Sequence, residues 1–246
     1  MKLDFREAGA VAVPRGSVAR LTESYRIEAV DFPFVVRLAR TDEQIRKAVT
    51  IRAEAYGRHV PTLAQLLAEP EPLDRQRGTV VFLAEGKEDG AALGTIRIQT
   101  NRTLPLRIEE SVELPAMLRG RCLVEVTRLA VTSGKRGALV KYALFKALHR
   151  FCLATQVEWM VIGARPPLDR GYLALDFQNL VPHGEMVPLR HSNNIPHHVL
   201  GFEVNSAERR WRERAHPLYD FMCRQFHPDI AVFASVSSVW ERPRGV

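Results

Sequence analysis

The stretch EVTRLAVTSGKRGALVKYAL, Glu125–Leu144, contains the pattern that decides the fold. Its first seven residues are rich in β-branched and apolar side chains and predict a strand. A small, basic loop follows, and from Val140 to Phe151 apolar residues recur at helical spacing. A strand that serves packing alone has little use for Glu125 or Arg128. The stretch therefore predicts a strand–loop–helix unit with a polar site on its strand.

Further strands and helices surround this unit. The segment TDEQ at Thr41–Gln44 fits a capping box and predicts a helix from Thr41 to about Tyr56. Other strands are predicted at 32–39, 79–86, 91–100, 159–163 and 198–204, and other helices at 166–177 and from residue 206. A hairpin followed by strands that alternate with helices predicts an α/β fold, with a mixed central sheet flanked by helices. We expect residues 1–30 to form an N-terminal arm and residues 31–246 a single domain with a C-terminal helical extension.

Composition and charge restrict the classes of function. The 246 residues are 46% hydrophobic, which is enough for a sizeable core. No apolar run approaches the ~18 residues that a transmembrane helix needs. The three cysteines form no C-x-x-C pair and the N-terminus has no long apolar segment, which together predict a cytoplasmic protein with reduced thiols. The net charge of +7 is diffuse and no nucleic-acid-binding motif is present, so an acidic protein partner is favoured over nucleic acid.

Three motifs carry a resemblance to a known family, namely GTIRIQT at 94–100, EVTRLAV at 125–131 and YLALDF at 172–177. With the order of elements from about Val35 to Phe177, they resemble the GNAT acyltransferase fold. Within it the chain is similar to the N-acyl amino acid synthases (FeeM-like) and, more distantly, to LuxI-type acyl-homoserine-lactone synthases. The resemblance implies an acyl donor on acyl carrier protein and a small amine acceptor such as an amino acid.

The resemblance also implies a set of site residues, which are Glu125, Arg128 and Tyr172 for catalysis and Arg97, Arg52 and Tyr56 for acceptor binding. Glu125 matches the family's candidate general base, and Tyr172 matches the tyrosine that protonates the leaving thiolate. A structural alternative stays open for each part of the set. Glu125 could form an ion pair with Arg97 or Arg128, Tyr172 could pack on a helix face, and Arg52 could be solvated.

The chemistry of amine acylation explains why a partly buried carboxylate would lie on this strand. An amine attacks a thioester only when neutral, and free α-amino groups have a pKa near ~8. A carboxylate whose pKa is raised by burial can take the amine proton. Strict alternation, however, puts Glu125 and Arg128 on opposite faces of the strand. A β-bulge near residues 127–129, which the resemblance supports, would bring them together and expose a backbone N–H to an oxyanion.

The loop TSGKRGA after this strand is suited to a phosphate. It offers backbone N–H groups at a helix start, and Lys135 and Arg136 add positive charge. The Q/R-x-x-G-x-G/A pyrophosphate motif of the wider superfamily is incomplete here, and Gly137 is the glycine that remains. We therefore expect the single phosphate of a carrier-protein arm at this loop, with Leu129 and Val131 beside the donor. An ordinary turn and helix cap is the alternative.

The sequence thus predicts an N-acyltransferase that uses an acyl-phosphopantetheine co-substrate and no metal or other cofactor. The segment HSNNIPHH at 191–198, with His183 nearby, suggests a metal, but no Cys or Asp completes a familiar ligand spacing. Cys122 is expected to be a structural thiol. The alternatives are a coenzyme-A-dependent GNAT N-acetyltransferase and a non-catalytic basic binding module. Peripheral membrane contact through a lipid product stays open.

Overall fold

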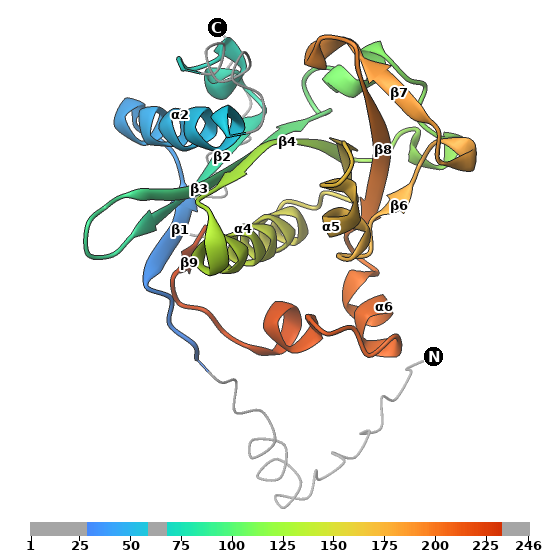
Figure 1. Ribbon diagram of the computed structural model, residues 1–246. Helices are drawn as coiled ribbons and strands as arrows, with labels where there is room; N and C mark the ends of the chain where they lie inside the picture. Colours follow the sequence, from blue (N-terminus) through green and yellow to red (C-terminus); the bar gives the residue numbers. More distant parts are fainter. Residues whose placement is uncertain (1–28, 59–67, 233–246) are drawn as a thin grey trace, which may run out of the picture.

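The computed structural model describes residues 29–58 and 68–232 and contains a mixed β-sheet with helices on both faces (Figure 1). The strand order is β6-β8-β5-β4-β3-β2-β1-β9, and β7 pairs with β8 outside this order. The strands are β1 (Phe34–Leu38), β2 (Thr79–Gly86), β3 (Ala92–Thr100), β4 (Leu123–Val131), β5 (Trp159–Ala164), β6 (Gln178–Asn179), β7 (Met186–Leu189), β8 (Ile195–Glu203) and β9 (Ile230–Ala231). The predicted mixed sheet flanked by helices is confirmed.

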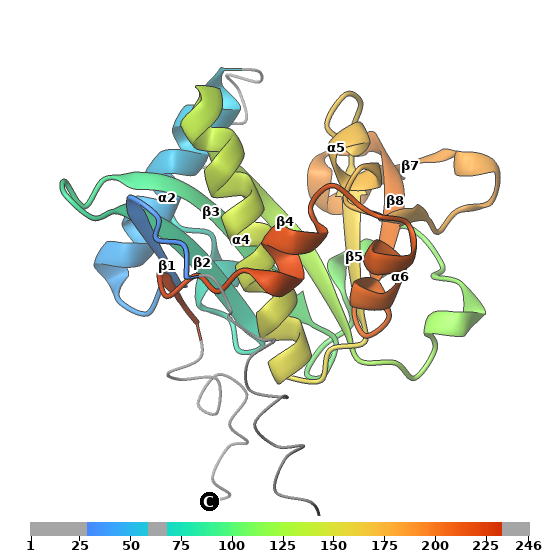
Figure 2. The ribbon, with the colours of Figure 1, turned by 90° about the horizontal axis from the view of Figure 1, so that it is seen from below.

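The sheet changes from antiparallel to parallel pairing in its middle. Strands β1 to β4 pair antiparallel in order, with β2 and β3 as the predicted hairpin, whereas β4 and β5 run parallel. The pairing of β4 with β5 includes only Leu123–Glu125 and Trp159–Val161, although both strands continue further. The two strands diverge beyond this short paired stretch (Figure 2). Glu125 is therefore the last residue of β4 that is held by neighbouring strands on both sides.

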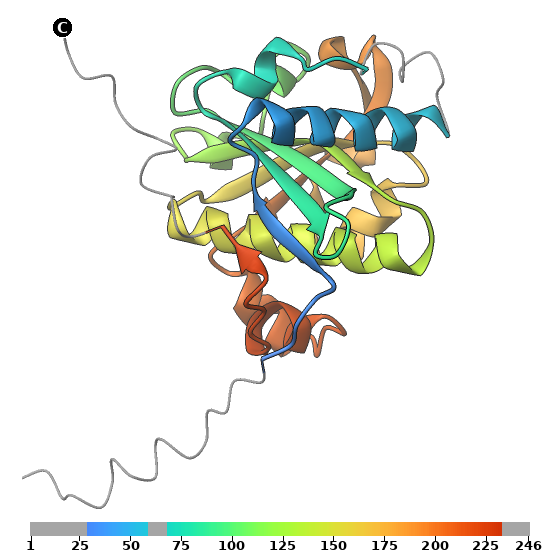
Figure 3. The same cartoon turned by 90° about the vertical axis from the view of Figure 1, so that its left-hand side faces the viewer.

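Two long helices cover the opposite faces of the sheet, α2 (Asp42–Gly57) on one face and α4 (Gly134–Ala154) on the other (Figure 3). The predicted capping box begins α2. The Gln44 N–H donates to Thr41 Oγ1 over 3.2 Å, and the Thr41 N–H donates to Gln44 Oε1 over 3.3 Å. These two bonds satisfy N–H groups that would otherwise lack a partner at the helix start, which fixes where α2 begins.

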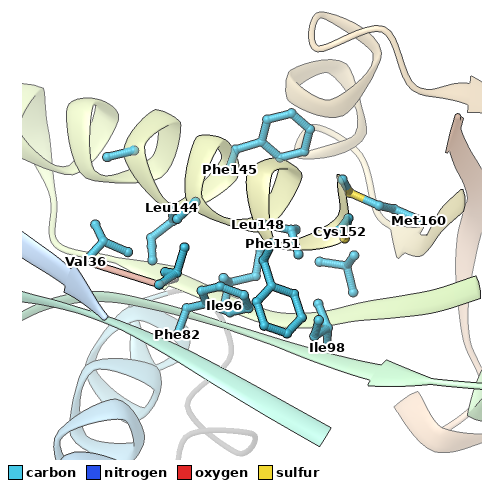
Figure 4. Packing of buried hydrophobic residues seen from close by; sticks show 14 of the residues in the cluster. Val36, Phe82, Ile96, Ile98, Leu144, Phe145, Leu148, Phe151, Cys152 and Met160 are labelled. Atoms are coloured by element: carbon cyan, nitrogen blue, oxygen red, sulfur yellow. The ribbon is translucent and has the colours of Figure 1, made fainter. Parts of the chain in front are cut away.

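The main hydrophobic core lies between α4 and the sheet. Figure 4 shows its central side chains, which are Val36, Phe82, Ile96, Ile98, Leu144, Phe145, Leu148, Phe151, Cys152 and Met160. Burial of one large apolar side chain stabilises the fold by about 1.5–3 kcal/mol. Because Ile96, Ile98 and Val124 face α4, the residues that alternate with them face α2. This alternation places the polar side chains Arg97 and Glu125 on the α2 face.

The helix predicted over residues 166–177 is shorter in the structure. Helix α5 spans Asp169–Leu173 and follows a cis peptide bond between Pro166 and Pro167. The prolines provide no N–H donor for helical hydrogen bonds. The chain turns out of the helical path at Asp176, whose φ of +73° lies in the left-handed region that usually favours glycine. The side chain of Asp176 accepts hydrogen bonds from Arg210 and Arg214, which hold this turn.

The C-terminal part of the chain returns to the first strand. Helix α6 (Ala207–Glu213) begins where the sequence predicts it, a π-helical turn follows at Asp220–Arg224, and β9 then pairs parallel with β1. The sequence predicted none of β6, β7 and β9. The predicted arm at 1–30 falls almost wholly outside the described residues and stays a prediction. Within the ranges 29–58 and 68–232, no helix has the length and apolar character of a membrane span.

Candidate active site

A β-bulge in β4 brings the two polar residues of the E-x-x-R motif onto one face. The register with β3 shifts between Thr95 and Arg97, and Arg128 takes a left-handed φ of +56°. The Arg128 side chain consequently reaches Glu71, to which its Nε and Nη2 atoms each donate over 2.6 Å. Glu71 also accepts a bond of 2.9 Å from Arg97 Nη1. The predicted bulge is confirmed, and Arg97 and Arg128 meet at one carboxylate.

The arginines belong to a larger buried ion-pair network. Arg52 of α2 donates from Nη1 to both oxygens of Asp74, over 2.8 and 2.9 Å, and Arg97 reaches the same carboxylate over 3.0 Å. The exposed fraction of Arg52 is 1%, so the expectation of a solvated Arg52 is wrong. Burial alone would raise the pKa of Glu71, but the Arg128 hydrogen bond and the charges of Arg97 and Arg128 lower it to about 2. Glu71 is therefore anionic at neutral pH.

The network has more positive than negative charge. Its members are the guanidinium groups of Arg52, Arg97 and Arg128 and the carboxylates of Glu71 and Asp74, and three positive minus two negative groups leave a surplus of +1. The Nε and Nη2 atoms of Arg52 are buried and have no hydrogen-bond partner in the part of the chain that the structure describes. Buried charged donors of this kind are costly unless a partner satisfies them. The network therefore holds one surplus positive charge and two unsatisfied donors at Arg52.

Glu125 lies apart from these ion pairs and is almost fully buried, with 1% of its surface exposed. Its Oε2 atom accepts a hydrogen bond of 3.0 Å from the Ile108 N–H in the 3₁₀ turn Arg107–Glu110. Burial raises the pKa of Glu125 to about 7, and the Ile108 hydrogen bond and the Arg107 charge only partly offset it. The alternative prediction, an ion pair between Glu125 and Arg97 or Arg128, is wrong. Both arginines bind Glu71 instead.

His191 is the residue of this site that the sequence analysis missed. It lies in the 3₁₀ turn Arg190–Ser192 between β7 and β8, and its Nε2 atom is 3.3 Å from Glu125 Oε1. Burial lowers the pKa of His191 to about 4, and the charges of Arg107 and Arg128 act in the same direction. The available signal was the cluster of histidines in HSNNIPHH. That cluster does not converge, since His198 faces Asp169 over 3.8 Å, away from His191.

Tyr172 of α5 and Tyr56 of α2 complete the polar residues that the sequence singled out. The ring of Tyr172 packs edge-on against Phe177, with 5.5 Å between ring centroids. Burial raises the pKa of the Tyr172 hydroxyl, and Tyr56 raises it further. Tyr56 also adds to the electrostatic environment of Arg128. Tyr56 therefore lies close enough to both Tyr172 and Arg128 to influence their pKa values.

The loop before α4 forms the other end of the candidate site. Lys135 and Arg136 are exposed, and the Ser133 side chain does not cap the helix. Gly137 is in close contact with the backbone, because a Cβ atom there would lie 1.7 Å from the Thr132 oxygen. A glycine is thus required where the helix start approaches the end of β4. Arg58 of the α2 C-cap donates to the Val131 oxygen over 2.8 Å, and Leu129 and Val131 pack against the α4 side of the core.

Comparison with known proteins gives the class of the chain, which is an acyltransferase of the GNAT fold. A sequence profile of the family described as "N-acyl amino acid synthase FeeM" matches residues 47–189, which is more than half of the 246 residues. The chain therefore belongs to the FeeM N-acyl amino acid synthase family, and it is an N-acyltransferase. An acyl-homoserine lactone synthase, from the class that the sequence resembles more distantly, is also among the similar structures. A search of curated proteins found no match.

Solved structures support the fold. FeeM, an N-acyl amino acid synthase from uncultured soil microbes, aligns with a TM-score of 0.55 at 19% identity, covering 77% of this chain and 98% of FeeM. BjaI, a CoA-dependent acyl-homoserine lactone synthase solved with SAM and isopentyl-CoA, aligns with a TM-score of 0.53 at 17% identity, covering 75% and 90%. A GNAT-family acetyltransferase from Desulfovibrio desulfuricans aligns with a TM-score of 0.50 at 14% identity, covering 70% and 99%. At these identities the alignments establish the shared fold.

Proposed function

We propose that the protein transfers an acyl chain from the phosphopantetheine thioester of an acyl carrier protein to the amine of an amino acid, with Glu125 as general base. The observation that carries the proposal is the state of Glu125. Its burial raises the pKa to about 7, and this value suits a group that must take a proton near neutral pH. Glu125 also lies where the pairing of β4 with β5 ends.

The arginine network supports an acceptor that carries a carboxylate. The surplus positive charge and the two unsatisfied donors of Arg52 together fit one monovalent anion. The α-carboxylate of an amino acid provides that charge, and it can accept two parallel N–H bonds from one guanidinium group. A neutral amine without a carboxylate would leave the Arg52 donors buried and unpaired. Arg52, Arg97 and Tyr56 are accordingly the proposed acceptor-binding residues.

The proposed reaction is an addition followed by an elimination. The acceptor amine nitrogen forms a bond to the thioester carbon, and Glu125 takes the amine proton directly or through one water. The negative charge moves to the former carbonyl oxygen, near the β4 bulge at Arg128 and Leu129. The carbon–sulfur bond then breaks, and Tyr172 donates a proton to the departing thiolate. Glu125 releases the amine proton to solvent and Tyr172 takes one up, which restores both groups. The products are an N-acyl amino acid and a carrier protein with a free thiol, so that no oxidant, metal or other cofactor takes part.

The α4 start supports a donor that presents one phosphate. Lys135 and Arg136 are exposed there, Gly137 packs closely against Thr132, and a helix start offers free N–H groups to a phosphate. Acyl-coenzyme A is the second candidate donor. The observation that favours it is the structural similarity to BjaI, which is described as CoA-dependent.

The experiment that tests the proposed function supplies the two candidate donors, acyl carrier protein and acyl-coenzyme A, in parallel reactions. The purified protein is incubated with a long-chain acyl carrier protein and a pool of amino acids, and the products are analysed by mass spectrometry. We expect an N-acyl amino acid and the free carrier thiol in equal amounts. Turnover of acetyl-coenzyme A with no product from the carrier protein would favour the second donor. Product formation at the wild-type rate by Glu125→Gln would exclude Glu125 as the base.

A second experiment tests the docking of the carrier. Acyl carrier proteins are small and acidic, and we expect the double variant Lys135→Glu, Arg136→Glu to lose at least about tenfold in kcat/KM with acyl carrier protein. Its kcat/KM with a short pantetheine thioester should change little. The matched control is Arg209→Glu, Arg212→Glu on α6, which changes the net charge equally. Equal losses with both donors, or from both double variants, would show that the loop does not bind a carrier.

A further inference from the structure

We infer that His191 is a positioning residue for Glu125, with an imidazole that holds the Oε1 atom and exchanges tautomers as Glu125 gains and loses a proton. This inference rests on the proposed role of Glu125 and adds a residue to it. The two side chains come from distant parts of the chain, β4 and the turn between β7 and β8. Their side-chain exposed fractions are only 8% for His191 and 2% for Glu125, so that they face each other out of contact with solvent.

The two oxygens of Glu125 are not equivalent. Oε2 accepts the Ile108 N–H, so an added proton belongs on Oε1. Oε1 is buried without a well-aligned hydrogen-bond partner in the described chain, and His191 Nε2 faces it at 3.3 Å. A small rotation of the imidazole would align this contact. His191 is then the group that responds to the protonation state of Glu125.

The other nitrogen of His191 leaves the tautomer free to change. The tautomer of a histidine is set by the hydrogen bond that each ring nitrogen makes. Nδ1 of His191 is buried and makes no well-aligned hydrogen bond among the described residues, although the backbone of Arg107 is close enough to act on the ring and raise its pKa. When Glu125 is ionised, a proton on Nε2 can be donated to Oε1. When Glu125 is protonated, Oε1 can donate to an unprotonated Nε2, and the imidazole proton moves to Nδ1.

The charged groups around the pair favour a neutral imidazole throughout this exchange. Arg107 lies beside both residues, Arg128 and His197 act on His191, and Arg97 acts on Glu125. Burial and these neighbours keep the pKa of His191 low, at about 4. His191 therefore does not compete with Glu125 for the proton of the amine. It stabilises the ionised carboxyl group by donating a hydrogen bond to it.

The first test measures the pair without any substrate. The full-length protein is labelled with ¹³C at glutamate carboxyl carbons and ¹⁵N in histidine rings, and the Glu125 signal is identified by its loss in Glu125→Gln. We expect the His191 ring nitrogens to change their chemical shifts with the same midpoint as the Glu125 carboxyl carbon, near pH 7. Ring nitrogens that stay constant between about pH 6 and pH 8 while Glu125 titrates would overturn the inference.

The second test uses variants. His191→Phe removes both bonds and should raise the Glu125 midpoint by about one pH unit, because the bond to the ionised carboxylate is stronger than the bond to the protonated one by about 1–1.5 kcal/mol. His191→Gln keeps an N–H donor and should restore most of the shift. His198→Phe, which alters the histidine that faces Asp169, is the matched control and should leave the midpoint unchanged. Identical midpoints in wild type and His191→Phe would refute the coupling.

Activity separates this inference from the proposed function. If both hold, the ascending limb of kcat/KM against pH moves with the Glu125 midpoint in His191→Phe, while the high-pH plateau and the KM for the acceptor are retained. An active Glu125→Gln would remove the general base and leave the coupled titration standing. An inactive Glu125→Gln together with an unchanged Glu125 midpoint in His191→Phe would support the general base and refute its coupling to His191.

Discussion

The variant Glu125→Gln should gain stability relative to the wild type as the pH rises. The free energy of unfolding of the wild type is expected to fall with pH because of Glu125, and the variant lacks this fall. Burial raises the pKa of Glu125 from the ordinary 4.5 to about 7, so between these values the folded chain keeps a proton that the unfolded chain has lost. By linkage, the free energy of unfolding of the wild type then falls as the pH rises. Since one pKa unit corresponds to about 1.36 kcal/mol, the wild type should lose about 2–3 kcal/mol between about pH 5 and pH 8 through this residue alone.

Urea unfolding of wild type and Glu125→Gln at pH 5 and pH 8 measures this loss. The free energy of unfolding of the wild type is subtracted from that of the variant at each pH, and the two results are compared. Every other titrating group is common to the two proteins, and the constant effect of the amide side chain cancels between the two pH values. Glu110→Gln, which removes an exposed acid two residues from Ile108, is the control for the loss of one carboxyl group. A gap between wild type and Glu125→Gln that changes by less than about 0.5 kcal/mol from pH 5 to pH 8 would refute the raised pKa.

Two further predictions concern the ion-pair network and the α4 start. Asp74→Asn should lower the free energy of unfolding by about 3–5 kcal/mol in urea titrations, because it leaves Arg52 and Arg97 with a buried charge in excess; a loss below about 1 kcal/mol would mean that the arginines find other partners. Gly137→Ala should lower the melting temperature and kcat/KM together, since its Cβ atom would lie 1.7 Å from a backbone oxygen. Gly171→Ala, whose Cβ atom would meet no atom closer than 3.9 Å, should behave as the wild type, and equal effects of both would contradict the packing argument.

The sequence predicted the parts of the site that lie within one continuous motif. Local patterning was enough for β4, α4 and the capping box of α2, because each depends on residues a few positions apart. The bulge at Arg128 came from the conflict between strand alternation and the E-x-x-R motif. These predictions succeeded because the side chains concerned are fixed by the backbone of their own element.

The partners of those side chains could not be predicted in the same way. Glu71 and Asp74 come from a proline-rich turn without periodicity, and His191 from a turn between two short strands, so no local pattern associates them with β4. Arg52 was misjudged for the same reason, since its burial depends on Asp74. Long-range ion pairs between irregular segments are decided by tertiary packing, which single-sequence patterns do not report.

These long-range contacts explain why Glu71 and Asp74 bind the arginines whereas Glu125 has a raised pKa. Had Arg97 or Arg128 paired with Glu125, the positive charge would have favoured the ionised carboxylate and lowered its pKa, which would weaken it as a base. Glu71 and Asp74 bind these arginines instead, so burial dominates at Glu125. If an acceptor carboxylate binds at Arg52 as proposed, it neutralises the remaining positive charge of the network. The proton affinity of Glu125 then increases at the moment when the amine to be deprotonated arrives.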